Sequence, residues 1–205
     1  MVILFYRHPL GVNDQTFYRF DYIRDMNTAA QYAEAILTCR TLFAKKMQDY
    51  GTAWRIMRLP SLTDQLYIKA KRIRSIELKG ISKVDEGIEP EFIALVNYAY
   101  LALIQNKLGL DGDIELPSDK TLAFYDEVAE ETRELMEAKN HDYGEAWRDM
   151  RISSLTDLIL MKLHRIKQIE DNEGETQVSE GVQGSYADIA NYSLFALIKM
   201  KHEVD

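Results

Sequence analysis

The chain has 205 residues, of which 46% are hydrophobic and 28% charged, with 10 Gly and 4 Pro. This composition can fill a hydrophobic core and excludes a disordered or fibrous chain, and a single cysteine excludes a disulfide scaffold. The net charge of −8 argues against a nucleic-acid partner. No apolar run reaches the roughly 18 residues of a membrane span, and the first residues do not resemble a secretory signal. We therefore expect a cytoplasmic protein with no membrane contact.

The charge is divided unevenly along the chain. Residues 1–110 carry 15 Lys and Arg against 11 Asp and Glu, a net of +4, whereas residues 111–205 carry 10 against 22, a net of −12. Such a division suits two units that dock on each other, and equally suits two units with different ligands.

The two halves of the chain are copies of each other. At an offset of 93, residues 49–77 and 142–170 share 17 identities over 29 positions, where chance would give about two, so we infer a tandem duplication. We predict three parts: an irregular N-terminal arm or gene-model extension (1–25), a basic first repeat with a degenerate site (26–110) and an acidic, functional second repeat (111–205). Two copies are too few for a solenoid, and the pair folds alone or as a homodimer.

Each copy is predicted to form three helices, so the fold class is all-α: two tandem three-helix repeats packed as a pseudo-two-fold helical bundle. In the second copy we predict that Ser118 caps the first helix and that Gly144, in the left-handed conformation, ends it. The Ser-Leu-Thr-Asp segment at 154–157 has the pattern of a capping box that begins the second helix, and the segment at 61–64 repeats it.

The spacing of apolar residues predicts what the helices bury. The second helix of copy two is expected to bury four residues, Leu158, Met161, Ile166 and Ile169. The third helix of that copy is expected to begin near Ser185, and Pro90 should lie in the first turn of its counterpart. Cys39 is predicted to be a buried helix residue.

A repeated aromatic and charged segment is the first candidate for binding chemistry. Asp142, Tyr143, Trp147 and Arg148 recur at the same spacing in copy one, and Arg151 follows them. An aromatic pair beside an arginine can stack a base and hold a phosphate. The alternative is a helix-ending turn with the tryptophan in the core and the arginine bridging carboxylates.

Two cations on the second helix of copy two form the second candidate. Lys162 and Arg165 are three residues apart, so they share one face of that helix. Such a pair suits the binding of phosphates, although a solvated face or ion pairs with the acidic loop would explain it as well.

The third candidate is a set of carboxylates in copy two. Asp188, Asn191 and Tyr192 share one helix face, Glu180 precedes that helix, and Ala94 replaces the aspartate in copy one. Glu134 belongs to a glutamate run on the first helix, which could also be a solvated face. Because oxygen ligands on neighbouring helices suit Mg²⁺, we predict metal binding by Glu180, Asp188 and Glu134, and catalysis by Glu180 and Asp188.

Taken together, the DYG-x-AWR segment, the SLTD segment, the cationic helix face and the late Asp-Ile-Ala-Asn-Tyr segment (188–192) resemble the nucleotide modification associated domain 1 family. A more distant similarity is to the all-α NTP pyrophosphohydrolases (MazG-like), which hold Mg²⁺ with E-x-x-E and E-x-x-D pairs. Asp188 matches the last acid of that pattern, but Ser185 stands where the first acid belongs.

The resemblance implies a helical protein of nucleotide metabolism that binds a nucleoside phosphate with Mg²⁺ in its second repeat. Lys162 and Arg165 would hold the phosphates, Tyr143 or Trp147 the base, and Asp188 the metal or sugar. If the protein is an enzyme, it is expected to be a Mg-dependent NTP pyrophosphohydrolase. The alternative is a non-catalytic interaction protein, whose repeated polar residues hold the bundle together.

Overall fold

The computed structural model describes residues 14–80, 87–110, 112–172 and 181–202, and the side chains from residue 28 onward. In these ranges the chain forms helices and no strand, which confirms the all-α fold class. The α-helices are α1 (Asp14–Tyr50), α2 (Leu59–Lys79), α3 (Glu89–Leu108), α4 (Ser118–Tyr143), α5 (Ile152–Asp171) and α6 (Gly181–His202). Two short 3-10 helices, η1 (Ala53–Ile56) and η2 (Ala146–Asp149), precede α2 and α5.

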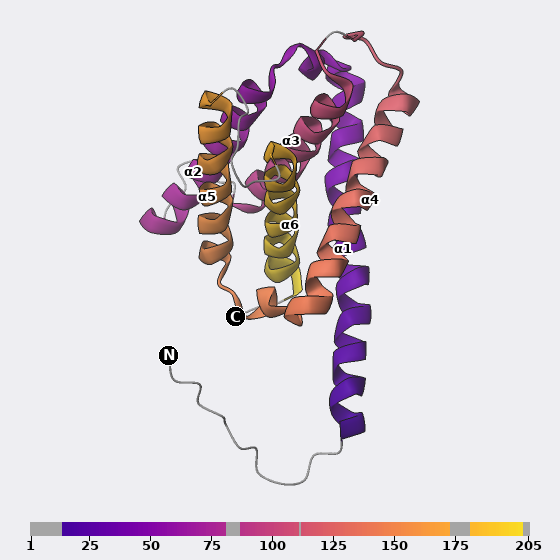
Figure 1. The fold of residues 1–205 in the computed structure, drawn as a ribbon, viewed down its shortest axis with the longest axis vertical. Helices are drawn as coiled ribbons and strands as arrows, with labels where there is room; N and C mark the ends of the chain where they lie inside the picture. Colours follow the sequence, from indigo (N-terminus) through magenta and orange to yellow (C-terminus); the bar gives the residue numbers. More distant parts are fainter. Residues whose placement is uncertain (1–13, 81–86, 111, 173–180, 203–205) are drawn as a thin grey trace.

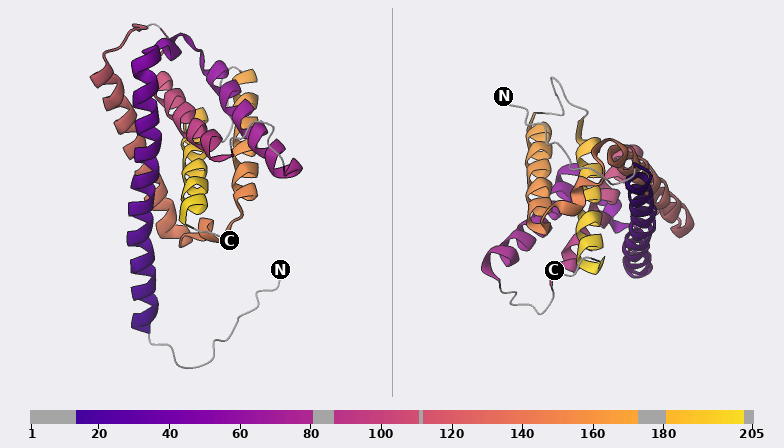
Figure 2. Two further views of the ribbon diagram at one scale, coloured as in Figure 1. Left: turned by 180° about the vertical axis from the view of Figure 1, so that it is seen from behind. Right: turned by 90° about the horizontal axis from the view of Figure 1, so that it is seen from below.

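The helices form three layers (Figure 1). α3 and α6 lie in the middle and contact each other, α1 and α4 cover one side, and α2 and α5 cover the other. The same layers are visible from behind in Figure 2, where the N-terminal part of α1 extends beyond the other helices. Each layer therefore contains one helix from each repeat.

The middle layer holds the core because its helices are apolar on most of their circumference. On α3, Leu95, Ala99 and Tyr100 are fully buried, and on α6 Ile189 and Leu194 are fully buried. None of the described helices is both long and apolar enough to cross a membrane.

Two matching hydrogen bonds tie the outer layer of α1 and α4 to the middle layer. The Tyr32 hydroxyl donates to Asn191 Oδ1 at 2.6 Å, and the equivalent Tyr125 hydroxyl donates to Asn97 Oδ1 at 2.8 Å. In the first bond the tyrosine belongs to the first repeat and the asparagine to the second, and in the other bond the reverse holds. A two-fold relation between the repeats would produce this reciprocity.

Reciprocal contacts also join α2 to α5. Thr63 Oγ1 donates to Glu170 Oε1 at 2.7 Å, and the equivalent Thr156 Oγ1 donates to Glu77 Oε1 at 2.8 Å. Two equivalent ion pairs accompany them, Arg74 with Asp157 and Lys167 with Asp64. The Thr and Asp of both Ser-Leu-Thr-Asp segments thus hold the two repeats together.

These contacts replace the capping boxes that we predicted, and that prediction is wrong. The N-cap residues of α2 and α5 are Arg58 and Arg151, and neither makes a side-chain capping hydrogen bond. Ser154 already lies inside α5. A serine followed three residues later by an acid fits a helix interior as well as its start, so the pattern alone did not fix the boundary.

Other helix boundaries agree with the sequence in part. Gly144 ends α4 in the left-handed conformation, and Pro90 lies in the first turn of α3, as predicted. Pro117 rather than Ser118 is the N-cap of α4. The helix α6 begins at Gly181, before the predicted Ser185.

Two further expectations differ from the structure. Of the four residues expected to be buried on α5, Met161 is 55% exposed and Leu158 is half-buried, whereas Ile159, which is not among them, is fully buried. The helix α1 begins at Asp14, so residues 14–25 are helical where we expected an irregular arm, and residues 1–13 lie outside the described part of the chain.

Cys39 is fully buried, as predicted, and burial raises the pKa of its thiol to about 12. We expect Ellman's reagent to modify the native protein at least about a thousandfold more slowly than the unfolded chain, because the thiolate forms only after unfolding. The measurement is the rate of modification across a urea gradient, with the chain in concentrated guanidinium chloride as the fully reactive control. Rapid modification of the native protein would contradict this burial.

Candidate functional site

Two of the cavities in the described part of the chain, one in each repeat, are lined by equivalent residues. The first, of about 390 Å³, is lined by the end of α1, η1 and α3. The second, of about 350 Å³, is lined by the end of α4, η2, α5 and α6. Seven identical pairs at matching positions line both cavities: Lys46 and Lys139, Tyr50 and Tyr143, Ala53 and Ala146, Trp54 and Trp147, Met57 and Met150, Asn97 and Asn191, Tyr98 and Tyr192. The short helices η1 and η2 lie at opposite ends of the molecule (Figure 1).

A sharp turn positions the aromatic residues of each cavity. Gly144 and Gly51 follow α4 and α1 with φ of 60° and 58°, a region that residues with a side chain rarely adopt. The chain reverses there and enters a 3-10 helix, which carries Trp147 in the second repeat and Trp54 in the first. The Asp-Tyr-Gly segment therefore repeats because both cavities need this reversal.

The second cavity contains a triad of charges. Lys139 Nζ lies 2.5 Å from Asp188 Oδ1, and Lys162 Nζ lies 2.6 Å from Asp188 Oδ2. Asp188 is 8% exposed, and two ammonium groups against one carboxylate leave this group of residues with a net positive charge. Half of the Lys139 side chain is exposed, so this lysine can turn toward a ligand.

The aromatic residues of the second cavity differ in their freedom. Tyr143 is 74% exposed beside the cavity and Tyr192 is half-buried. Trp147 is buried, its ring stacks on Phe195 at a centroid distance of 4.3 Å, and the Arg148 guanidinium lies 4.3 Å from its centre. Tyr143 is thus available to stack on a ligand, whereas the Trp147 ring serves the core.

The structure brings six of the predicted site residues to this cavity: Tyr143, Trp147, Lys162, Asp188, Asn191 and Tyr192. Asn191 is already engaged, because its amide oxygen accepts from Tyr32 and its amide nitrogen donates to the Thr132 carbonyl. Its presence in both repeats therefore has a structural explanation.

The other predicted residues do not line the cavity. Asp142, Arg151, Arg165 and Glu134 are exposed. Glu180 lies outside the described part of the chain.

Arg148 faces the N-terminal helix instead of the cavity. Its guanidinium donates to Glu145 Oε2 at 2.6 Å and to Gln31 Oε1 at 2.8 Å, and it also contacts Thr28. The alternative that we gave for this arginine, in which it bridges carboxylates, agrees with these contacts in part, because Glu145 is a carboxylate whereas Gln31 and Thr28 are not.

Lys139 is the site residue that our sequence analysis missed. It lies three residues before the repeated Asp-Tyr-Gly segment, and copy one has Lys46 at the same position. The identity is a usable signal, but it lies just outside the aligned blocks 49–77 and 142–170.

The described residues of the second cavity do not fit a magnesium ion. Asp188 is the one carboxylate among its described lining residues, and a lysine occupies each of its oxygens. Among the described residues, no three His, Cys, Asp or Glu side chains come close enough to hold a metal ion together. Mg²⁺ prefers several oxygen ligands, so we derive no metal-dependent step.

Comparison with known proteins supports one family. No curated protein and no solved structure shows a significant match to the chain. The model of the family described as nucleotide modification associated domain 1 matches residues 46–106 and 139–200, once in each repeat and over more than half of the chain. The more distant similarity to NTP pyrophosphohydrolases stays a hypothesis. The two matched segments contain nearly all the residues that line the two cavities, and the chain belongs to the nucleotide modification associated domain 1 family.

Proposed function

We propose that the second repeat binds a nucleoside phosphate in its cavity. The observation that carries this proposal is the convergence of Lys139 and Lys162 on Asp188 inside a cavity of about 350 Å³. Two ammonium groups at one point suit a phosphate, because charge-assisted hydrogen bonds to an anion are the stronger ones. The family's association with nucleotide modification supports a nucleotide as the ligand.

In this proposal each cavity residue binds a different part of the ligand. Lys139, which is half exposed, turns from Asp188 toward the phosphate, while Lys162 remains beside Asp188. The carboxylate of Asp188 then accepts a hydrogen bond from a sugar hydroxyl or a base N–H. The exposed ring of Tyr143 stacks on the base, since aromatic stacking tolerates every base.

We propose binding rather than hydrolysis. Ser185 stands in place of the first acid of the E-x-x-D pattern, and Asp188 is neutralised by two lysines. A pyrophosphohydrolase of the MazG-like type needs carboxylates that are free to hold metal. The arrangement of charges in this cavity suits an anionic ligand better than a cation.

The test is calorimetric titration with a panel of nucleoside mono-, di- and triphosphates, with Mg²⁺ and with a chelator. We expect binding that survives chelation, and about 10- to 100-fold weaker binding by Lys139→Met and by Lys162→Met, because the first removes a charge-assisted hydrogen bond to the phosphate and the second removes the other positive charge of the cavity. Lys120→Met is the matched control, since this exposed lysine lies on the same helix as Lys139 but away from the cavity.

The three possible failures have different meanings. Absence of binding by every nucleotide would overturn the proposal and leave the interaction protein as the better description. Binding that requires Mg²⁺ would contradict the role given to the lysines and favour the carboxylates. Equal affinity in Lys139→Met, Lys162→Met and Lys120→Met would place the nucleotide elsewhere.

A further inference from the structure

We propose that the cavity of the first repeat is a second ligand site, which takes an aromatic monoanion. This inference goes beyond the function proposed for the second repeat, because it concerns a different cavity and a different class of ligand. It rests on the charges, the aromatic lining and an unpartnered indole N–H of the first cavity.

The first cavity keeps the framework of the second but has lost its carboxylate. Ala94 occupies the position of Asp188, and no Asp or Glu is among the described residues that line the cavity. Lys46 is the one charged residue of the described lining. The described carboxylates form no ion pair with it, so its charge is not balanced locally.

The carboxylate of the first repeat lies one turn away and serves other cations. Glu91, which corresponds to Ser185, is 3% exposed and pairs with Lys69 and Arg72. Lys69 corresponds to Lys162, so the second lysine of the triad is held away from the cavity. The first cavity therefore offers one positive charge, whereas the second offers two with a carboxylate between them.

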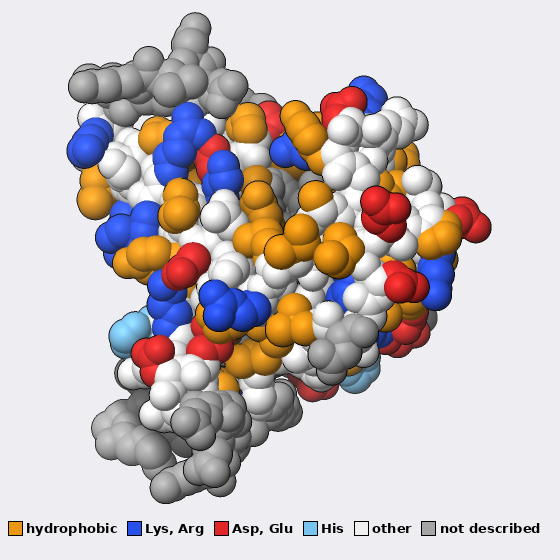
Figure 3. Space-filling model, turned by 90° about the horizontal axis from the view of Figure 1, so that it is seen from above, with side chains coloured by type: hydrophobic (Ala, Val, Ile, Leu, Met, Phe, Trp, Pro, Cys, Tyr) orange, Lys and Arg blue, Asp and Glu red, His pale blue; other side chains and the backbone are white. Residues whose placement is uncertain are grey.

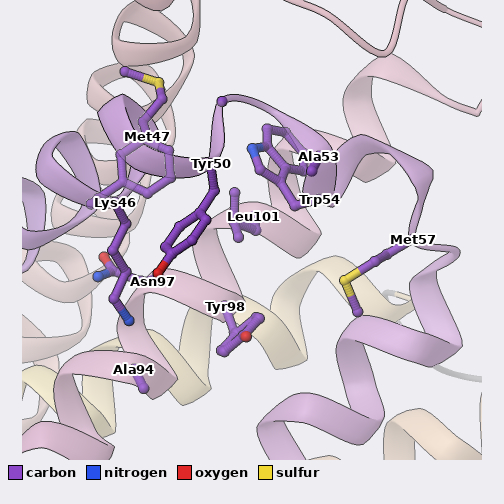
Figure 4. Close-up of a pocket in the computed structure, with 12 residues that line it drawn as sticks. Lys46, Met47, Tyr50, Ala53, Trp54, Met57, Ala94, Asn97, Tyr98 and Leu101 are labelled. Carbon is purple, nitrogen blue, oxygen red and sulfur yellow. The ribbon is translucent and has the colours of Figure 1, made fainter.

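Aromatic side chains surround the remaining space. Figure 4 shows Tyr50, Trp54 and Tyr98 arranged around the cavity, with Met57 on one side and Lys46 on the other. Tyr50 is 73% exposed, so its ring is free to pack against a ligand. Ring faces of this kind favour a flat aromatic ligand, in stacked or edge-to-face contact.

The Trp54 indole supplies a directed hydrogen-bond donor. Its Nε1 atom is buried, has no acceptor among the described residues, and lies on the side of the ring turned toward Tyr50 (Figure 4). Buried donors nearly always have a partner in folded proteins. Asn97 offers little here, because its amide already binds Tyr125 and the Cys39 carbonyl. An acceptor atom on a bound ligand would satisfy the indole.

The outer surface near this cavity is also apolar. Figure 3 views the end of the molecule where α1 ends, and hydrophobic side chains gather in the middle of that face with Lys, Arg, Asp and Glu around them. Ile56, on η1, is 67% exposed. A volume of about 390 Å³ accepts a bicyclic ring with one anionic substituent. A polyphosphate would need more cations than Lys46 alone.

The experiment uses the full chain and a pair of probes that differ in charge. The anionic probe is 1-anilinonaphthalene-8-sulfonate, and N-phenyl-1-naphthylamine is its uncharged analogue. The two tryptophans lie one in each cavity, so Trp147→Phe leaves Trp54 as the single reporter. We expect the anionic probe to quench Trp54 by energy transfer and to bind at least about tenfold more tightly than the neutral probe.

Two substitutions test the chemistry of the site without relying on that reporter, by the fluorescence of the probe itself. Lys46→Met removes the charge, and Ala94→Asp gives the first cavity the carboxylate of the second. We expect each substitution to lower the affinity for the anionic probe by about tenfold or more and to leave the affinity for the neutral probe unchanged. Lys45→Met is the matched control, because this exposed lysine precedes Lys46 on α1 and does not line the cavity.

The outcomes decide the inference separately from the nucleotide proposal. Equal affinity for both probes, or no effect of Lys46→Met relative to Lys45→Met, would overturn it. Circular dichroism of each variant checks that the helices persist. Loss of nucleotide binding in Lys139→Met together with unchanged binding of the anionic probe would support two independent sites.

Discussion

We expect Arg55→Met to lower the free energy of unfolding by about 2–4 kcal/mol. Arg55 is 3% exposed, and its guanidinium donates to Gln105 Oε1, to the Gly109 carbonyl at 2.9 Å and to the Asp113 carbonyl at 3.3 Å. Methionine fills a similar volume but donates nothing, so the buried amide oxygen of Gln105 loses its donor, whereas its amide nitrogen still donates to the backbone carbonyl of residue 55. The exposed linker carbonyls can bind water in the variant, so the loss of stability is smaller than it would be for a fully buried hydrogen-bond network.

The same arginine holds the linker between the repeats. Thr52 helps, because its hydroxyl donates to the Ile114 carbonyl at 2.6 Å and accepts from the Leu116 amide at 3.0 Å. The variant should therefore release the linker as well as destabilise the fold. A glutamate-specific protease should cut after the exposed Glu115 faster in Arg55→Met than in the unaltered protein.

Urea unfolding followed by circular dichroism measures the stability, and fragment masses identify the protease cut. Arg58→Met is the control, because Arg58 is exposed on the same segment. A stability loss in Arg55→Met within about 0.5 kcal/mol of that control would show that the buried guanidinium contributes nothing net.

The sequence predicted the helices because their signals are local. Apolar spacing, the glycine at the end of α4 and the proline in α3 each depend on residues within a turn or two. The Ser-Leu-Thr-Asp segments misled us because their polar groups serve contacts between the repeats. Thr156 finds its partner Glu77 at a separation of 79 residues, and no local pattern carries that information.

The candidate site was predictable to the extent that the duplication exposed it. Asp188 was a candidate because copy one has Ala94 at that position. Lys162 was a candidate because the same cationic helix face recurs in copy one. Their meeting in one cavity depends on the packing of α5 against α6, which the sequence does not state. Tyr143 or Trp147 was expected to stack on a base, and the Trp147 ring is buried against Phe195, as in the alternative that placed it in the core.

The two cavities differ mainly in where a carboxylate stands on the middle helix. Glu91 in the first repeat and Asp188 in the second are one turn apart in register, and each binds the lysine of the neighbouring helix. Moving the acid by one turn changes the cavity from one exposed cation to a charge triad. A duplicated fold can thus carry two differently charged cavities while reciprocal contacts, such as those of Tyr32 with Asn191 and Tyr125 with Asn97, are retained.

Asn191→Ala is expected to lower the free energy of unfolding by about 2–4 kcal/mol. Asn191 is 4% exposed, accepts from the Tyr32 hydroxyl at 2.6 Å and donates to the Thr132 carbonyl at 3.3 Å. Alanine leaves the Tyr32 hydroxyl buried without its acceptor and opens a small cavity between α1, α4 and α6. The same change at Asn97 removes the equivalent bond to Tyr125.

A double-mutant cycle separates the hydrogen bond from the cavity. Urea unfolding of Tyr32→Phe, Asn191→Ala and the double variant should give a coupling energy of about 1–2 kcal/mol, and the Tyr125 and Asn97 cycle should give a similar value. If Asn191 were kept in both repeats for ligand binding alone, the coupling to Tyr32 would be near zero and nucleotide affinity would fall instead. Similar coupling in both cycles would show that equivalent hydrogen bonds join the two repeats. This structural role would account for the presence of Asn97 in the first repeat, where the cavity has no carboxylate among its described lining residues.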